Sequence, residues 1–561
     1  MAVGEIERWI GQAEQQLILA QHTIERNWQD YVRAPLDMAR SRSDAAAKLL
    51  AQAKQLYAAG LASSRDSRDS REAALQARNE ALDSYLLALP SRAAEARGVW
   101  YRPTEQSGAE VCRTLDRMLE AGFNELYLET WFWGYTIYPS TAAAGYGVEN
   151  QHPSFLGWDP LHVFAVESRK RGIALHAWLD GFMVGIHPTG GPVLRVYPEW
   201  GALARRQCGA DRPQPQPGTG YYWLDITNPN VRAYLMAIMV EIITGYEIAG
   251  VNVDFIRLPH AADNNPDDSY CFSSHARRAF EKEHGVDPKD IDAREQPDMA
   301  MVWSQWLADI EDSFMSDMYR TLKSVRPHTI VSATPEPGAE SDKIGQWSAC
   351  VDVVIPQSYY ASTEDVRASF VAHKAQLNPG NLVYTGIYPM YARMGTLETI
   401  EQVLAARDLD EGTVIFAFGQ ATSEANRALR LGPWRDKAIS PGVYPRRAIR
   451  ALLAAVVKDV EQSYIPRSGI SDEAAAVLIG RLNDLLTASR ADEGLDRGTD
   501  GLWAARIFEL SEWLSGRKEA EVHPAVHEQL KAAFAQMAAI LNYMQEKQIL
   551  EEKEDRNSSQ P

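Results

Sequence analysis

The segment 249–259 places an amide and a carboxylate two residues apart at the end of a short apolar run. Alternate side chains of a β-strand share a face, so Asn252 and Asp254 point to one side and the intervening valines to the other. In a barrel of parallel strands, side chains at the C-terminal strand ends point into the mouth, where an Asn/Asp pair can do chemistry. An ordinary strand that ends in a turn-forming aspartate is the alternative interpretation.

Other strand-like runs end in polar residues in the same way. On the face that period-two alternation makes polar, the residues are, run by run, Tyr127 and Glu129; His176, Trp178 and Asp180; Asn252 and Asp254; Ser332, Thr334 and Glu336; Gln357 and Tyr359; and Tyr384 and Tyr388. Like charges brought together at one rim raise the free energy of the fold. Several carboxylates gathered there therefore indicate a functional site rather than a stabilising feature.

Paired carboxylates among aromatic side chains are typical of sites that hydrolyse glycosidic bonds. One carboxyl group donates a proton to the leaving oxygen, and the other attacks the anomeric carbon or activates a water molecule. Aromatic faces can stack on the sugar rings. The long insertions after the second, third and fourth runs supply such aromatics, namely Trp131, Trp133, Tyr135, Tyr138, Trp158, Trp200, Tyr221, Tyr222 and Trp223.

Each of these polar residues also has a purely structural interpretation. Glu129 could pair with Arg102, and Asp180 could cap the turn that follows it. His176 is better explained as a hydrogen-bonded interior histidine than as a catalyst. The choice between these interpretations depends on where the fold places each side chain.

The middle of the chain alternates strand-like and helix-like patterns. The strand-like runs are 98–101, 125–130, 173–180, 250–255, 329–334, 351–357, 382–388 and 413–418. The helical patterns between them include 109–121, 160–171, 231–246, 301–325, 363–376 and 397–407. Strand then helix, repeated eight times, predicts a (β/α)8 barrel of the α/β class. A doubly wound open sheet is the competing fold, but it needs a Gly-rich phosphate loop that the sequence does not contain.

Both ends of the chain are rich in helix-forming residues and carry no strand-like run. We expect helices at 5–31, 40–59, 71–89, 446–463, 471–488, 503–515 and 527–546, with the Arg-Asp-Ser repeat at 65–71 as a solvated linker. The predicted parts are an N-terminal helical region (1–95), the barrel (96–437), a C-terminal helical domain (438–550) and a disordered tail (551–561).

The composition excludes several classes of partner. A formal charge of −18 argues against nucleic acid or an anionic membrane, since both require clustered Lys and Arg. No segment resembles a membrane span, and residues 1–20 lack the apolar core of a signal peptide. The four cysteines show no metal-ligand spacing, and we predict no metal or other cofactor. The acidic run at 263–268 could bind Ca²⁺ but fits a solvated loop better.

Residues 97–420, about three-fifths of the chain, resemble the barrels of glycosyl-hydrolase-like family 10, a family of bacterial proteins. The segments that carry the resemblance include Arg97-Gly98-Val99-Trp100, Gly122-Phe123-Asn124, Tyr138-Pro139-Ser140, Trp158-Asp159-Pro160-Leu161, His176-Ala177-Trp178, Asn228-Pro229-Asn230-Val231-Arg232, Gly250 through Asp254 with Arg257 and Pro259, and Pro356-Gln357-Ser358-Tyr359. Their order and spacing make a coincidence improbable.

The family is similar in its strand-end layout to the α-amylase superfamily. That resemblance implies that Asp254 is the nucleophile, Glu336 the acid/base and Asn252 the polar residue beside the nucleophile. Two features depart from the pattern. The seventh strand offers no carboxylate, so Glu129 or Asp180 would have to supply the third acid, and Phe255 stands where the family usually has a second acid. The resemblance also implies action on bacterial envelope glycan, including peptidoglycan strands stripped of peptides, and an extracellular or cell-envelope location.

We therefore predict a glycosidase, with retention of configuration favoured, that uses Asp254 and Glu336 on a polysaccharide or oligosaccharide. The residues expected to bind the carbohydrate are Glu129, Trp131, Trp133, His176, Trp178, Asp180, Asn252, Arg257, Gln357, Tyr359 and Tyr388. The alternative is a carbohydrate-binding or scaffold protein on a barrel that does not catalyse. A cytoplasmic location is also compatible with the sequence, which does not predict the oligomeric state.

Overall fold

The computed structural model describes residues 3–60, 64–259, 269–336, 344–490 and 499–558. Its centre is a barrel of eight parallel strands, which closes because the first strand pairs with both the second and the last. The strands are β1 (Ala96–Tyr101), β2 (Glu125–Phe132), β4 (Ala174–Leu179), β7 (Gly250–Val253), β8 (Ile330–Ala333), β9 (Val353–Val354), β10 (Leu382–Ile387) and β11 (Gly412–Ile415). The predicted (β/α)8 fold is confirmed, and closure excludes the open doubly wound sheet.

Alternation along the strands divides their side chains between two cores. One set, including Trp100, Tyr127 and Tyr384, fills the barrel interior, and the other, including Leu126 and Leu128, packs against the helices outside. These surrounding helices are α4 (Gly108–Ala121), α6 (Pro160–Arg171), α8 (Pro229–Gly245), α10 (Pro297–Val325), α12 (Thr363–Lys374), α13 (Thr396–Leu404) and α14 (Ser423–Leu431). The strand ends are thereby held in one rigid ring.

Local signals in the sequence set where the helices begin and end. The hydroxyl of Ser107 accepts from the Glu110 N–H at the start of α4, and the carboxylate of Asp159 accepts from the His162 N–H at the start of α6. Helix α4 ends at Gly122, whose φ of 98° is a left-handed conformation that favours glycine. Helix α4 then leads into β2, and α6 into β4, within a few residues.

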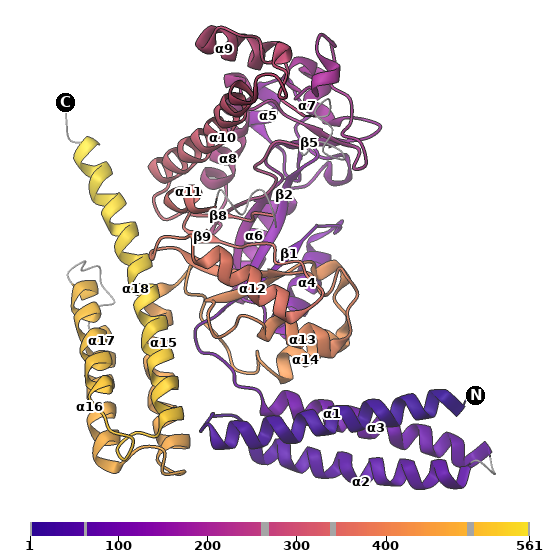
Figure 1. Ribbon diagram of the computed structural model, residues 1–561, viewed down its shortest axis with the longest axis vertical. Helices are drawn as coiled ribbons and strands as arrows, with labels where there is room; N and C mark the ends of the chain where they lie inside the picture. Colours follow the sequence, from indigo (N-terminus) through magenta and orange to yellow (C-terminus); the bar gives the residue numbers. More distant parts are fainter. Residues whose placement is uncertain (1–2, 61–63, 260–268, 337–343, 491–498, 559–561) are drawn as a thin grey trace.

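The long connections gather at one end of the barrel, in the upper part of Figure 1. The connection from β2 to α6 holds β3 (Tyr135–Thr136), α5 (Thr141–Gly145) and a 3₁₀ turn. The connection from β4 to α8 holds the antiparallel pair β5 (Met183–Ile186) and β6 (Tyr221–Trp223) with α7 (Gly191–Val196), and the one from β7 to α10 holds α9 (Ser274–His284). These insertions build walls beside the mouth.

The N-terminal region is a three-helix bundle of α1 (Val3–Gln29), α2 (Leu36–Gly60) and α3 (Ser64–Ala88). Small residues, including Ala13, Ala46 and Ala77, form part of its core and let the helices approach closely. The repeat at 65–71 was predicted to be a linker, and that prediction is wrong, because α3 begins at Ser64. The hydroxyl of Ser70 donates to the carbonyl of Ala53 at 2.7 Å, which fixes this part of α3 to α2.

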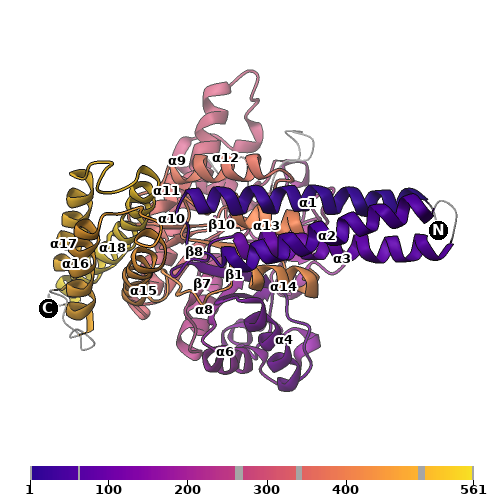
Figure 2. The same cartoon turned by 90° about the horizontal axis from the view of Figure 1, so that it is seen from below.

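The C-terminal region is built from α15 (Pro445–Asp459), α16 (Asp472–Arg490), α17 (Thr499–Ser515) and α18 (Pro524–Ser558). Figures 1 and 2 show it beside the barrel, and it meets the near end of the N-terminal bundle, where the rings of Tyr31 and His523 lie 4.8 Å apart. Helix α18 continues through residues 551–558, which differs from the disordered tail that the composition predicts. Tyr543 of α18 reaches the interior core of the barrel and donates to the Gly442 carbonyl at 3.0 Å. None of the helices in the described ranges is long and apolar enough to cross a membrane.

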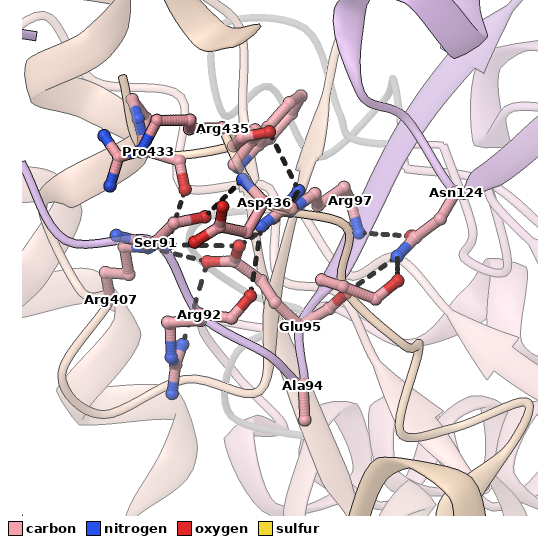
Figure 3. Close-up of polar contacts among 12 residues, drawn as sticks. Ser91, Arg92, Ala94, Glu95, Arg97, Asn124, Arg407, Pro433, Arg435 and Asp436 are labelled. Carbon is pink, nitrogen blue, oxygen red and sulfur yellow. Dashed lines mark hydrogen bonds and ion pairs between the residues drawn. The ribbon is translucent and has the colours of Figure 1, made fainter. Parts of the chain in front are cut away.

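The N-terminal end of the barrel is held by a buried ion cluster (Figure 3). Glu95 accepts from Arg97 Nε at 2.8 Å and from Arg407 Nε and Nη2 at 2.7 and 3.2 Å. Arg97 also donates to the carbonyl of Asp436 at 2.7 Å, and Asn124 donates to the carbonyl of Glu95 at 2.9 Å. The cluster therefore ties β1 to β2 and to the segment that follows α14.

Candidate active site

The C-terminal ends of β2, β4, β7 and β8 bring four carboxylates to the mouth of the barrel. These are Glu129, Asp180, Asp254 and Glu336, and we call them the acid ring. Each acts electrostatically on at least one other member of the ring, which places the four in one site. Alternation from the interior residues toward the C-terminal strand ends is what points these side chains inward.

Asp254 is the most firmly oriented member of the acid ring. Its Oδ1 accepts from the backbone N–H of Phe255 at 2.8 Å and from Gln357 Nε2 at 3.1 Å, and its Oδ2 accepts from Trp178 Nε1 at 3.2 Å. Burial raises the pKa of Asp254 to about 6; the Phe255 N–H opposes this rise and the charge of Glu336 adds to it. The carboxylate is therefore ionised at neutral pH and held in one geometry.

Glu336 follows β8 and faces the same space. Its Oε1 accepts from Arg257 at 2.7 Å, and its side chain is 31% exposed, so a ligand can reach it. The Arg257 guanidinium lies over the rings of Trp223 and Phe255, at 5.0 and 5.4 Å from their centroids. The β5–β6 pair carries Trp223, so this insertion fixes the arginine that positions Glu336.

Glu129 and Asp180 lie together beside Arg102, which follows β1. Arg102 Nε donates to Glu129 at 2.8 Å, the ion pair that the sequence offered as a structural interpretation. Burial nevertheless raises the pKa of Glu129 to about 7, because Arg102 offsets the burial only in part. Burial, Glu129 and Asp254 raise the pKa of Asp180 well above its usual range. Asp180 is only 1% exposed, and its Oδ1 has no hydrogen-bond partner among the described residues.

Aromatic side chains cover the side of the mouth opposite β4 and β7. Tyr359 stacks on Tyr388 and on Phe416, with ring centroids 5.1 and 6.0 Å apart, and Tyr391 lies 5.3 Å from Phe416. Tyr359 and Tyr388 were predicted as site residues, whereas Phe416 and Tyr391 were not. Phe416 could have been found, because it continues the alternation through Val414 at the end of the eighth strand.

Asn252 lies beneath the acid ring, in the interior of the barrel. Its Oδ1 accepts from Trp100 Nε1 at 3.0 Å and its Nδ2 donates to Ser332 at 2.9 Å. The side chain is fully buried. The structure therefore gives Asn252 a supporting position across β1, β7 and β8 and not a place on the surface of the mouth.

Besides Asn252, three residues predicted to bind carbohydrate, namely Trp131, His176 and Trp133, lie away from the acid ring and its aromatic wall. A bulge at Thr130 shifts the pairing of β2 with β4, so that Trp131 turns outward into the core shared with the helices and lies near Tyr234 of α8. His176 stacks on Tyr127 deep in the barrel, 3.6 Å from Glu125. Both side chains are buried away from the acid ring, so the structure does not support the predicted contacts of Trp131 and His176 with a ligand.

Trp133 is the third residue, and it lies on the insertion after β2. Its side chain is 39% exposed and meets Phe132 edge to face at 5.5 Å. Gly134 follows it with a φ of 79°, which lets the chain turn back into β3. An extended ligand could still reach Trp133.

In the described part of the chain, no group of three or more His, Cys, Asp or Glu residues could hold a metal ion. The acidic run at 263–268, which was considered for Ca²⁺, lies outside the described residues. The four cysteines are free thiols, and only Cys271 is fully buried.

A comparison with known families matches residues 93–388 to the family described as Glycosyl hydrolase-like 10. The chain belongs to this family. Among curated relatives, glycosyl hydrolase YngK of Bacillus subtilis is 22% identical over 343 residues, 58% of each chain. Glycosyl hydrolase DigH of Escherichia coli K12 is 23% identical over 144 residues, 25% of this chain and 32% of that protein. This family 10 chain thus covers less than two thirds of the length of either relative.

The matches of this family 10 chain to solved structures have low sequence identity. The catalytic domain of a β-amylase from Paenibacillus polymyxa is 10% identical, with a TM-score of 0.41, and the match covers 60% of this chain and 95% of that one. The spore cortex-lytic enzyme SleL of Bacillus megaterium is 9% identical, with a TM-score of 0.35, and covers 62% and 76%.

Proposed function

We propose that this family 10 protein hydrolyses glycosidic bonds, with Asp254 as the nucleophile and Glu336 as the general acid and base. The observation that carries the proposal is the geometry of Asp254, which three donors hold on the same mouth as Glu336. A carboxylate that is buried, ionised and oriented in this way is suited to attack at one fixed position.

The proposed reaction has two steps. Glu336 protonates the glycosidic oxygen while an oxygen of Asp254 attacks the anomeric carbon, so the sugar becomes bonded to Asp254 and the remainder leaves as an alcohol. Glu336 then removes a proton from water, which attacks the same carbon and releases Asp254. Two inversions give net retention of configuration. Arg257 pairs with the ionised form of Glu336 and would stabilise it between the steps.

Several neighbours would bind the sugar. Tyr359, Tyr388 and Phe416 present ring faces for stacking, and Asp180 has one oxygen with no partner among the described residues, which a sugar hydroxyl would complete. We propose a glycan of the bacterial envelope as the substrate, including peptidoglycan strands freed of peptides, and a location outside the cytoplasmic membrane. Support for both comes from family likeness, and YngK and DigH are named glycosyl hydrolases.

The test combines a panel of envelope glycans with two isosteric variants. Mass spectrometry should detect new reducing ends with the unmodified protein. Asp254→Asn and Glu336→Gln should each lower the rate at least about a thousandfold, as expected for loss of a nucleophile or an acid. Circular dichroism should show that both variants fold. A near-normal rate in either variant would remove that residue from the mechanism.

A second candidate function is binding of carbohydrate without catalysis. The end of β10 carries no carboxylate that could serve as the third acid of an α-amylase-like site, and Glu336 is already engaged by Arg257. Binding of glycans with no new reducing ends, unchanged in Asp254→Asn, would favour this candidate over hydrolysis.

A further inference from the structure

A cavity lies beside the acid ring. It has a volume of about 390 Å³ and lies between the C-terminal ends of β1 and β11, against α4. Arg102 and Phe416 belong to its wall and also border the mouth, where Arg102 pairs with Glu129 and Phe416 stacks on Tyr359. Its volume lies in the range of about 300–1,000 Å³ that is usual for sites binding small molecules. A ligand held at the acid ring could therefore continue into this cavity.

The charge of the cavity is opposite to that of the mouth. Two arginines, Arg102 and Arg117, line it, together with neutral polar groups of Thr104 and Gln420, and no described lining residue is acidic. Glu105 lies behind the wall, but its carboxylate is buried and accepts from the Tyr101 and Thr114 hydroxyls and from the Thr104 N–H. That carboxylate is therefore not presented to a ligand.

Both guanidinium groups keep donors for a ligand. Arg117, on the exposed face of α4, lies over the Phe418 ring at 5.1 Å and makes no hydrogen bond or ion pair with any residue in the described ranges. Arg102 is half-exposed, and its only hydrogen bond to a described residue runs from Nε to Glu129, which leaves both terminal nitrogens. The Phe416 ring packs against the Arg102 guanidinium, and the Phe418 ring packs against the Arg117 guanidinium. These contacts restrict both side chains, which lowers the conformational entropy that they lose on binding a ligand.

We propose that this cavity binds a sugar unit that carries a carboxylate, next to the unit held at the acid ring. A planar guanidinium donates two parallel hydrogen bonds to a carboxylate, which a lysine or a neutral amide cannot do. Thr104 and Gln420 would bind hydroxyls of the same sugar. Asp254 at the acid ring, which no arginine pairs with in the described residues, repels a carboxylate, so the charge contrast sets the register of the glycan: a neutral unit at the ring and an acidic unit beside it. If the protein is the proposed hydrolase, this register also sets the point of cleavage; that consequence alone rests on the proposed function.

The test measures binding with the Asp254→Asn protein, so that no turnover occurs. The probes are peptide-free peptidoglycan strands, whose lactyl ethers carry carboxylates, and a galacturonic acid hexamer, each before and after chemical reduction of the carboxyl groups. Arg117→Gln should weaken binding of at least one carboxylated probe about tenfold, as for loss of a charged hydrogen bond. It should change binding of the reduced probe less than about twofold. Arg113→Gln, on the same helix and outside the cavity, is the matched control and should change neither.

The outcomes separate this inference from the proposed function. Equal binding of carboxylated and reduced probes, no effect of Arg117→Gln on carboxylated glycans, or no binding of either carboxylated probe would overturn the inference. Hydrolysis by the unmodified protein is scored separately. Charge-dependent binding without new reducing ends would support the inference and contradict the hydrolase, whereas hydrolysis that is indifferent to Arg117 would do the reverse.

Discussion

The two ends of the barrel both bury carboxylates, but they differ in how completely hydrogen bonds and ion pairs satisfy the carboxylate oxygens of the described residues. There, burial would raise the pKa of Glu95, but the guanidinium groups of Arg407 and Arg97 outweigh it and lower the pKa to about 2. Asp410 beside them accepts from Arg92 and Thr385, so both of its oxygens have partners even though burial raises its pKa to about 7. At the mouth, burial outweighs the neighbouring arginine, and the pKa of Glu129 is about 7.

This contrast indicates what each end is for. Paired and hydrogen-bonded carboxylates tie segments together, while carboxylates that remain partly unsatisfied lower the stability of the fold and are kept where a ligand completes them. Asp180 is the clearest case, because one of its oxygens has no partner in the part of the chain that the structure describes and two other acids lie close to it. The same residue type therefore stabilises one end of the barrel and prepares the other for binding.

Breaking the N-terminal cluster should have the largest effect on stability. Glu95→Gln leaves two buried arginines without their carboxylate, and we expect a loss of about 3–5 kcal/mol in the free energy of unfolding. Urea denaturation followed by circular dichroism measures it. Glu424→Gln removes an exposed partner of Arg78 and should change stability by no more than about 0.5 kcal/mol. Equal effects of the two substitutions would contradict the account of this cluster.

Replacing Asp180 with a neutral residue should raise the free energy of unfolding, opposite to the effect of Glu95→Gln. Because the folded protein holds the pKa of Asp180 above its unfolded value, stability falls as the pH rises through the unfolded pKa. Asp180→Asn should therefore stabilise the protein by about 1–2 kcal/mol at pH 8. The gain should disappear near pH 4, where the unmodified residue is already protonated. A variant that is less stable at both pH values would show that Asp180 is satisfied after all.

The dependence of rate on pH should reflect Asp254. A nucleophile must be ionised, and the pKa of Asp254 is about 6, so kcat/KM should fall below that pH to about one tenth of its plateau at pH 5. The measurement is the initial rate of reducing-end release in overlapping buffers. An acidic limb centred near pH 4 would mean that a different, less buried carboxylate controls the reaction.

The smallest predicted effect concerns the amide that positions Asp254. Gln357→Met keeps most of the volume but removes the donor at 3.1 Å from Asp254 Oδ1, and kcat should fall about fivefold. Because the ionised form loses a donor, the acidic limb should also move to higher pH. A lower kcat with an unmoved limb would indicate a packing defect instead.

The fold was predictable because period-two alternation and repeated strand–helix units depend on local sequence. The same alternation predicted where Asp254 and Asp180 point. It failed at Trp131, because one extra residue at Thr130 reverses the face of β2 without any signal in composition. The start of the helix at 65–71 was missed because a run of polar residues is as compatible with the exposed side of a helix as with a loop.

The cavity between β1 and β11 could not be predicted from local patterns. Arg117 and Phe418 lie about 300 residues apart in sequence and meet only because the barrel closes. Arg102 gave a partial signal, since its pairing with Glu129 was foreseen. What the sequence does not show is that its remaining donors face a cavity free of acids.

The most direct test of the account is a crystal structure of the Asp254→Asn protein with a bound oligosaccharide. We expect the scissile oxygen within hydrogen-bond reach of Glu336 and the anomeric carbon facing residue 254, with the two carboxyl positions about 5–6 Å apart for a retaining enzyme. The assignment would be contradicted if residues 254 and 336 could not both reach the same glycosidic bond of the bound sugar. It would also be contradicted if Glu129 and Asp180 flanked that bond instead.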